Sequence, residues 1–270
     1  MHIQFDHFVT TIEVVPPLGF DAKPLLSSLE ALNFLMFDGF SVATNPVAKA
    51  RMSAMAVCVL AQQKMNRPAI LHVTTRDHNF LSLQAMLWGA KALGITTVLA
   101  ATGDYVALGD RATTTTVRDL DVYGLIKMAR ESDLQTGVVI DPKILPAGIQ
   151  KAAERLRKKI DAGAQFAVTQ PVYGEKDAEN LAKAVCGLGI PVVMGILPLR
   201  TSRHAEFLHE KVSGITVPGD LRKRMAEAKD SIKEGVDNAK EMLAIARTHF
   251  KGACIMPPFD HYEVMPDILT

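Results

Sequence analysis

The chain has 270 residues, in which 30 Lys and Arg nearly balance 29 Asp and Glu, so its formal net charge is +1. This balance excludes a global basic field for nucleic acid and an acidic tail. The N-terminal stretch MHIQFDHFVTTIEVV carries Asp6 and lacks a basic region followed by a long apolar run, so we expect neither a signal peptide nor a membrane span. The three cysteines, Cys58, Cys186 and Cys254, lie far apart, which predicts buried, reduced thiols in a cytoplasmic protein.

Short apolar segments that resemble buried strands alternate with stretches of helical period along the chain. The expected strands are Val9–Val15, Gly39–Ala43, Ile70–Thr75, Thr96–Ala101, Thr136–Ile140, Phe166–Thr169, Pro191–Ile196 and Ala253–Met256. The expected helices include Lys49–Asn66, Leu81–Leu93, Pro146–Ala162 and Asp177–Gly187, and an extra helical segment over roughly Asp220–Phe250 precedes the last strand. This alternation predicts a single (β/α)8 TIM barrel of the α/β class that spans residues 1–270 as one domain. A GxGxxG turn after an early strand is absent, which disfavours an open dinucleotide-binding sheet.

Polar or backbone-permissive residues follow every predicted strand. They are Glu13, Asn45, Arg76 with Asp77, Gly103 with Asp104, Asp141, Gln170, Gly195 and the corner Pro257–Pro258–Phe259. The C-terminal ends of barrel strands share one face, and barrel enzymes assemble their sites there, so these residues predict a common site. Any one of them alone is equally compatible with a strand cap or a turn.

Two acidic residues in this set have surroundings that suggest chemistry. Glu13 lies in TIEVVPP among apolar neighbours, so we expect a raised pKa that would let it act as a general acid near neutral pH. The alternative is an ion pair with Arg76 or another barrel residue, and the local sequence does not decide between the two. Asp104 follows Gly103, whose missing Cβ lets backbone approach a ligand, and a carboxylate there could stabilise a developing cation. A Gly-Asp pair is also a common turn.

Basic residues cluster on the helix predicted after the fifth strand. Lys151, Arg155, Lys158 and Lys159 have spacings of three and four that place three of them on one face. Such a face could neutralise a dinucleotide pyrophosphate, or it could be a solvated helix surface. His72 lies within the third strand, where a hydrogen-bonded core histidine is the favoured interpretation. No His, Cys or carboxylate cluster accompanies it, so we expect no metal site.

Seven motifs occur in an order that resembles the methylenetetrahydrofolate reductase family: TIEVVPP, SVATNP, HVTTRDHN, LAATGD, DAGAQFAVTQPVY, GILPL and PPFDHYE. They span essentially the whole chain, and the chain is similar to the short bacterial form and to the reductase portion of fused homocysteine methyltransferase–reductases. The resemblance implies an FAD-bearing barrel that reduces 5,10-methylenetetrahydrofolate to 5-methyltetrahydrofolate in one-carbon metabolism and methionine synthesis. The implied partners are the folate and an electron donor, which could be NADH, NADPH or a protein such as ferredoxin, and a homo-oligomer or partner subunit is compatible with it.

The resemblance also implies roles for individual residues. Glu13 matches the general acid that helps to open the five-membered ring of the folate to an iminium cation, and Asp104 matches an aspartate beside the flavin that favours this cation. The residues expected to bind the cofactor are Asn45, His72, Thr102, Gly103, Asp104, Lys158 and Lys159, joined by Arg155 from the basic helix face. The residues expected to contact the substrate are Gln170, His204, Leu208 and His261.

The chain departs from the family pattern at three places. A tyrosine and a histidine common after the fifth strand are missing, because the chain reads VVIDPK there. Leu208, with Phe207 beside it, stands where nicotinamide-dependent members can carry a stacking phenylalanine, and His261 replaces an arginine that can meet the folate glutamate tail. These departures leave the flavin contacts, the electron donor and polyglutamate recognition open.

Two other functions remain compatible with the sequence. One is a pterin-binding barrel that transfers a methyl group without a flavin. The other is an accessory subunit that docks onto a partner reductase or methyltransferase.

Overall fold

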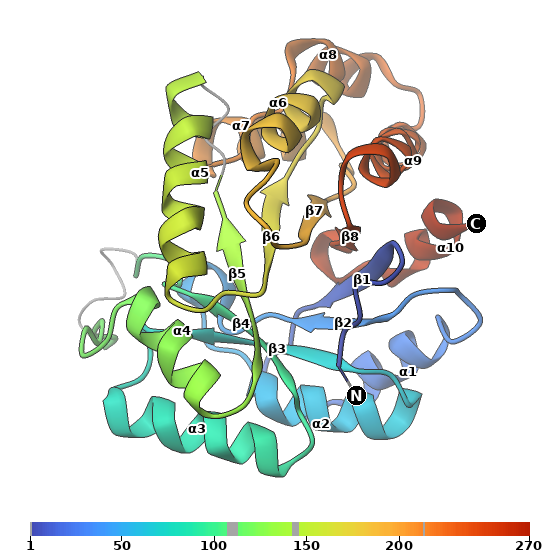
Figure 1. The fold of residues 1–270 in the computed structure, drawn as a ribbon. Coiled ribbons are helices and arrows are strands. Elements are labelled where there is room, and N and C mark those ends of the chain that lie inside the picture. Colours follow the sequence, from blue (N-terminus) through green and yellow to red (C-terminus); the bar gives the residue numbers. More distant parts are fainter. Residues whose placement is uncertain (1, 107–112, 142–145, 213) are drawn as a thin grey trace.

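The computed structural model describes residues 2–106, 113–141, 146–212 and 214–270 (Figure 1). Within these ranges, parallel strands pair in sequence order and β8 pairs with β1, so that the sheet closes into an eight-stranded barrel. The strands are β1 Val9–Val14, β2 Gly39–Val42, β3 Ala69–Thr74, β4 Thr97–Ala101, β5 Gln135–Ile140, β6 Phe166–Pro171, β7 Val192–Ile196 and β8 Gly252–Ile255. This confirms the predicted (β/α)8 fold, and every predicted strand boundary lies within two residues of the observed one.

Helices surround the barrel and connect its strands (Figure 1). They are α1 Lys23–Glu30, α2 Ala54–Met65, α3 Phe80–Ala92, α4 Val122–Glu131, α5 Pro146–Asp161, α6 Glu175–Val185, α7 Ser202–Lys211, α8 Gly219–Glu227, α9 Ser231–His249 and α10 Met265–Leu269, with short 3-10 turns at Pro46–Ala48, Pro258–Asp260 and Tyr262–Val264. The extra helical segment before the last strand is confirmed, and it consists of two helices, α8 and α9.

The helix predicted over Lys49–Asn66 was extended too far toward its N-terminus, because α2 begins at Ala54. Residues just before it use their backbone donors elsewhere. The amide of Arg51 donates to the side chain of Asn45, and the amide of Met52 donates to the carbonyl of Pro17. These contacts hold the segment against the loops that follow β1 and β2 instead of in a helical turn.

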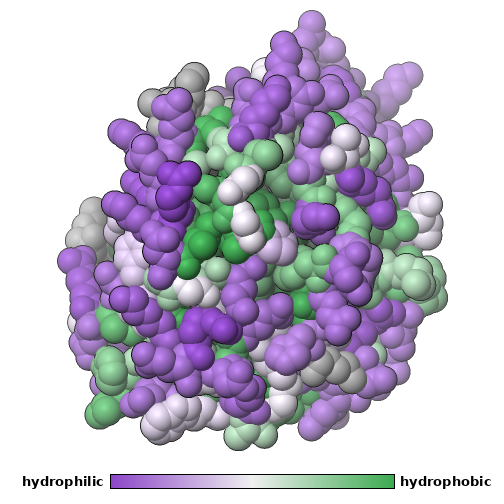
Figure 2. Space-filling view, in the orientation of Figure 1, coloured by the Kyte–Doolittle hydropathy of each residue, from purple (hydrophilic) through white to green (hydrophobic). Residues whose placement is uncertain are grey.

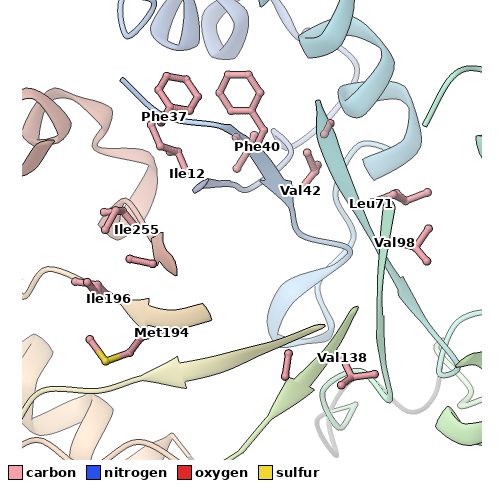
Figure 3. Close-up of a cluster of buried hydrophobic side chains, with 14 of the residues drawn as sticks. Ile12, Phe37, Phe40, Val42, Leu71, Val98, Val138, Met194, Ile196 and Ile255 are labelled. Carbon is pink, nitrogen blue, oxygen red and sulfur yellow. The ribbon is translucent and has the colours of Figure 1, made fainter. Parts of the chain in front are cut away.

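Side chains alternate between the two faces of every strand, which divides the buried apolar residues into two groups. The outward group lies between the strands and the helices, where β1, β3 and β7 contribute Ile12, Leu71 and Met194 (Figure 3). Fully burying an apolar side chain of this size contributes about 1.5–3 kcal/mol. Because successive residues point to opposite faces, Glu13 and His72, which follow Ile12 and Leu71, point into the barrel.

The inward apolar group fills the barrel below its C-terminal mouth. It comprises Ile3, Val9, Ile70, Leu99, Phe166, Val168, Val193 and Cys254. The ring of Phe166 is fully buried, and Gly137 on β5 makes room for it, since a Cβ on Gly137 would lie 2.2 Å from the ring. Phe5, which precedes β1, contacts the same ring with centroids 5.3 Å apart. The interior is therefore a packed core, and a ligand would enter from the C-terminal end of the strands.

The surface in the view of Figure 2 is mainly hydrophilic, and hydrophobic side chains are exposed in an area beside α5, over β5 and β6. Among the described residues, no helix has the length and apolar composition that crossing a bilayer requires. The three cysteines are free thiols. Cys58 and Cys254 are buried as predicted, whereas Cys186 is exposed because it follows the last residue of α6.

The extra helix α9 packs against β7 and β8, and it approaches the chain that leaves β7 very closely. Gly235 of α9 is buried against the backbone of Leu199, and a Cβ on this glycine would lie 1.8 Å from the Leu199 carbonyl oxygen. Because Gly235 has no side chain, α9 can pack directly against the backbone of the loop between β7 and α7.

We expect Gly235→Ala to lower the free energy of unfolding by about 2–3 kcal/mol, since backbone must move to admit the methyl group. Gly89→Ala is the matched control, because Gly89 also lies inside a helix, α3, where the nearest atom to an added Cβ is the Met55 sulfur at 4.0 Å. The control should raise the free energy of unfolding by about 0.5–1 kcal/mol through helix propensity. Urea unfolding of both variants measures this, and equal effects would contradict the packing argument.

Candidate active site

Glu13 lies near the C-terminal end of β1 and is partly buried inside the barrel mouth. Its register partner on β2 is Ser41. Within the described part of the chain, no hydrogen bond or ion pair reaches the Glu13 carboxyl, and burial raises its pKa to about 7. The alternative of an ion pair with Arg76 is wrong, because Arg76 pairs with Asp77. A carboxyl group with this pKa can hold a proton close to neutral pH and donate it.

Two further groups lie close to the Glu13 carboxyl. Burial, with a smaller contribution from the charge of Glu13, raises the pKa of the Cys254 thiol to about 12. Burial, together with the charges of Asp260 and Glu13, also raises the pKa of Tyr262. Both side chains therefore stay protonated around neutral pH and keep the surroundings of Glu13 uncharged. Sequence reasoning missed Tyr262, because no local pattern shows that a residue near the C-terminus packs beside β1.

His72 extends this polar interior from β1 and β2 to β3. Its Nε2 atom is 2.7 Å from the hydroxyl of Ser41, and its backbone carbonyl accepts a hydrogen bond of 2.5 Å from Thr44. Burial lowers the pKa of His72 to about 4, so the imidazole is neutral at physiological pH. The predicted hydrogen-bonded core histidine is confirmed, and a contact between His72 and a cofactor stays a prediction.

Arg76 connects the ends of β2, β3 and β4. Its guanidinium donates two hydrogen bonds to Asp77, of 2.6 and 2.7 Å. It also donates to the backbone carbonyls of Asn45, at 3.2 Å, and Asp104, at 3.1 Å. Burial opposes ionisation of Asp77, but hydrogen bonds from Arg76 and Asn45 hold its pKa below the ordinary value. Arg76 thus links the predicted site residues Asn45 and Asp104. The sequence alone did not indicate that Arg76 makes these contacts.

Gly103 and Asp104 form the corner after β4. Gly103 has φ +88°, and a Cβ there would lie 3.1 Å from the Arg76 Cβ and 3.2 Å from the Thr74 Cβ. The left-handed backbone favours glycine, and the neighbouring side chains would have to shift by a few tenths of an ångström to admit a Cβ. The Asp104 carboxylate is exposed and accepts a hydrogen bond of 2.6 Å from the amide of Val47.

A cleft of about 750 Å³ opens at this corner. Its lining includes the predicted residues Thr102, Gly103 and Asp104. The other residues that line it are Thr75, Arg76, Tyr105, Val106, Thr114, Thr115, Thr116, Val117, Arg118, Leu120, Asp121 and Val122. The run Thr114–Thr116 forms the wall of the cleft that faces Gly103. The run is visible in the sequence, but the sequence does not show that it lies next to the ends of β3 and β4.

The basic residues of α5 do not share one environment. Lys159 is partly buried, and its ammonium group donates a hydrogen bond of 2.7 Å to the carbonyl of Val139 on β5. Burial and the charge of Arg155 lower its pKa. Lys151, Arg155 and Lys158 are exposed. Lys159 therefore reaches the barrel, whereas the other three match the solvated-surface alternative as closely as they match a phosphate site.

The segment VVIDPK, where the expected tyrosine and histidine are missing, ends beyond the described residues, since residues 142 and 143 lie outside them. The preceding strand, β5, is described up to Ile140. In the described part of the chain, no group of three or more His, Cys, Asp and Glu side chains could hold a metal ion.

Gln170 lies near the end of β6, on the other side of the mouth from the cleft. The hydroxyl of Thr169 donates to the Gln170 carbonyl at 2.7 Å and accepts from the amide of Gly195 at 2.9 Å. These bonds coincide with a shift in register between β6 and β7. The side-chain amide of Gln170 makes no hydrogen bond to any described residue, so it is available to a ligand.

The other predicted substrate residues lie on α7 and in the loop after β8. His204 is 9% exposed, and its ring faces that of Phe259. His261 is hydrogen-bonded to Glu263. Leu208 is 5% exposed and belongs to a packed cluster around α7 and α8. This packing does not favour the predicted contact between Leu208 and the substrate, which stays a prediction.

Comparison with known proteins shows the family to which the chain is similar. A model of the family described as methylenetetrahydrofolate reductase matches residues 1–252. Methylenetetrahydrofolate reductase 2 of Saccharomyces cerevisiae is 27% identical over 182 residues, which cover 63% of this chain and 30% of that protein. The 5,10-methylenetetrahydrofolate reductase of Buchnera aphidicola is 25% identical over 201 residues, 72% of this chain and 66% of that protein. The matches therefore span less than two thirds of these curated relatives.

A solved structure shares the fold. A protein from Clostridium thermocellum, described as binding two copies of 5-methyl-5,6,7,8-tetrahydrofolic acid, superposes with a TM-score of 0.71 at 15% identity. The alignment covers 97% of this chain and 93% of that chain. At this identity the likeness establishes the barrel fold and its extent.

Removal of Arg76 should be strongly destabilising. Its side chain is 4% exposed and that of Asp77 is 19% exposed, so Arg76→Ala leaves a largely buried carboxylate without its partner. We expect a loss of about 3–5 kcal/mol in the free energy of unfolding. Arg224→Ala is the control, because the ion pairs of Arg224 with Glu234 and Glu241 lie on the surface and should contribute less than about 1 kcal/mol. Chemical denaturation of both variants measures the difference.

The raised pKa of Glu13 predicts a pH-dependent effect on stability. Between the ordinary pKa of 4.5 and about 7, the folded protein binds a proton at Glu13 that the unfolded chain has released. The contribution of Glu13 is therefore fully present below pH 4.5 and is lost as the pH rises through 7. Relative to the wild type, Glu13→Gln should become steadily more stable between these pH values. A stability difference that does not change with pH would disprove the raised pKa.

Proposed function

Because the chain belongs to the methylenetetrahydrofolate reductase family, we propose that it reduces 5,10-methylenetetrahydrofolate to 5-methyltetrahydrofolate with a bound flavin as hydride carrier. The observation that carries the proposal is Glu13, a carboxyl group inside the barrel mouth with a pKa raised to about 7. The family match supports the class of reaction, and Glu13 supports the acid that this reaction needs.

Glu13 is proposed to donate its proton to a ring nitrogen of the folate. Protonation makes this amine a better leaving group, so its bond to the methylene carbon breaks and the five-membered ring opens to an iminium cation. Addition of a hydride to the iminium carbon then gives the methyl group. The free carboxylate of Glu13 and the carboxylate of Asp104 both favour the cation by their negative charge.

The cleft beside Gly103 fits a flavin nucleotide in size and in chemistry. Its volume of about 750 Å³ lies in the range of small-molecule sites, about 300–1,000 Å³. Thr102 and the wall Thr114–Thr116 offer hydroxyl groups, and Arg118 offers a positive charge for phosphate. We propose FAD as the cofactor, held also by Asn45 and Lys159. When bound, the reduced flavin supplies the hydride.

The folate is proposed to lie over the β6, β8 and β1 ends of the mouth. The side-chain amide of Gln170 there makes no hydrogen bond to a described residue, His204 lies in the first turn of α7, and His261 lies in the loop after β8. The Clostridium thermocellum barrel, which binds methyltetrahydrofolate, supports this fold as a folate-binding scaffold. The electron donor is NADH, NADPH or a reduced protein such as ferredoxin.

The flavin-free methyltransferase and the accessory subunit remain the alternative functions. The absorbance spectrum of the freshly purified protein separates the first from a reductase, because a bound flavin absorbs in the visible range and the flavin-free protein would lack its bands. Activity of the isolated chain with a donor and methylenetetrahydrofolate excludes the second. The family match favours the reductase over both.

We expect Glu13→Gln to separate the two halves of the reaction. The variant cannot donate a carboxylic proton, so reduction of methylenetetrahydrofolate should stop, whereas its flavin should still be bleached by the donor under anaerobic conditions. Stopped-flow absorbance with each donor in turn, followed by addition of folate, measures both steps.

Glu131→Gln is the control for this experiment, since Glu131 is exposed at the end of α4, and it should behave as the wild type. Folate turnover by Glu13→Gln at the wild-type rate would remove Glu13 from the role of acid. Absence of a flavin that any donor reduces would instead refute the proposed reductase.

A further inference from the structure

The loop after β8 presents an aromatic ring at the barrel mouth. Pro257 and Pro258 restrict the backbone, and the next residues, Phe259 and Asp260, have φ values of +52° and +62°. Side chains other than glycine rarely adopt this left-handed conformation, and bulky ones such as phenylalanine least of all. Despite its size, Phe259 is 69% exposed. A strained backbone here turns an apolar ring toward solvent instead of into the core.

Contacts on one side hold the Phe259 ring in place. The His204 ring lies 4.9 Å away between centroids, at an interplanar angle of 51°. His204 is itself anchored in the first turn of α7, where its amide donates to the Thr201 hydroxyl at 3.0 Å. Burial and the charge of Arg200 lower the pKa of His204 to about 4, so the ring beneath Phe259 is neutral.

Other exposed aromatic residues in loops after strands lack such support. Phe20, after β1, is 96% exposed, and Tyr105, after β4, is 94% exposed. Neither takes part in a ring contact within the described ranges. Phe259 therefore combines an open face with a fixed position, which is what a flat ligand needs from a platform.

The position of this loop links the ring to the proposed acid. Tyr262 follows Phe259 by three residues, and the charge of Glu13 reaches Tyr262 strongly enough to contribute to its raised pKa, after burial and Asp260. β8, which leads into the loop, pairs directly with β1, the strand that carries Glu13. The loop that carries Phe259 therefore lies beside the strand that carries Glu13.

From this geometry we propose that Phe259 is a substrate-binding residue whose open face stacks on a flat ring of the folate. The proposal rests on the proposed function for the identity of the ligand, and it assigns the stacking contact to the loop after β8 instead of to Leu208, which is buried. Both the pterin and the aminobenzoyl group of a folate are flat and polarisable, so either would gain from an aromatic face.

The test is the dissociation constant of 5-methyltetrahydrofolate, measured by titration calorimetry on the purified full chain with its bound cofactor. Phe259→Leu keeps an apolar side chain but removes the aromatic face, and it should weaken binding about 5-fold to 10-fold. Phe259→Trp should bind within about 2-fold of the wild type, because the face is retained. Phe34→Leu is the matched control, since Phe34 is also 69% exposed but lies beyond α1, and it should leave binding unchanged.

Kinetics provide a second measurement. In Phe259→Leu the KM for the folate should rise, while the rate of flavin reduction by the donor stays at the wild-type value. If Phe259→Leu binds 5-methyltetrahydrofolate with wild-type affinity, or if Phe34→Leu loses as much affinity as Phe259→Leu, the proposed stacking role of Phe259 is wrong. A wild-type protein that binds 5-methyltetrahydrofolate without reducing methylenetetrahydrofolate refutes the reductase alone, and the binding series still decides the role of Phe259. A wild-type protein that binds no folate overturns both.

Discussion

The buried pair of Arg76 and Asp77 is the interaction on which the shape of the barrel mouth depends. A guanidinium has donors in a fixed plane, and here it satisfies Asp77 in two places while it reaches the backbone after β2 and after β4. Loops after strands are the variable part of this fold, and nothing in the strand ladders determines their paths. Arg76 ties together the loops after three successive strands, so the cleft beside Gly103 has a defined wall.

The mouth is thereby divided into two sectors with different physical character. The sector beside β3 and β4 holds the cleft, and Arg76 and the Asp104 carboxylate lie in its wall. The sector formed by β6, β8 and β1 holds Glu13, Gln170 and the aromatic loop after β8. The proposed function uses this division, with the flavin in the sector beside Gly103 and the folate over the ends of β6, β8 and β1.

The fold was predictable because its signal is periodic. Buried parallel strands are short apolar runs, and the polar residue that ends each run marks the C-terminal face, which is how Glu13, Asp104 and Gln170 came into view. Contacts between distant segments were not predictable. The bonds from Arg76, the fold of Thr114–Thr116 over the cleft and the burial of Leu208 each depend on packing that no local spacing encodes.

The filled interior of the barrel has a consequence for the supply of protons. Apolar side chains such as Phe166 fill the barrel interior, and burial lowers the pKa of His72 to about 4, so this imidazole is neutral near pH 7. Glu13 lies at the barrel mouth, on the side from which a ligand would also enter. In the proposed reaction, a ligand that covers the mouth separates Glu13 from bulk water, so we expect Glu13 to regain its proton after the product leaves.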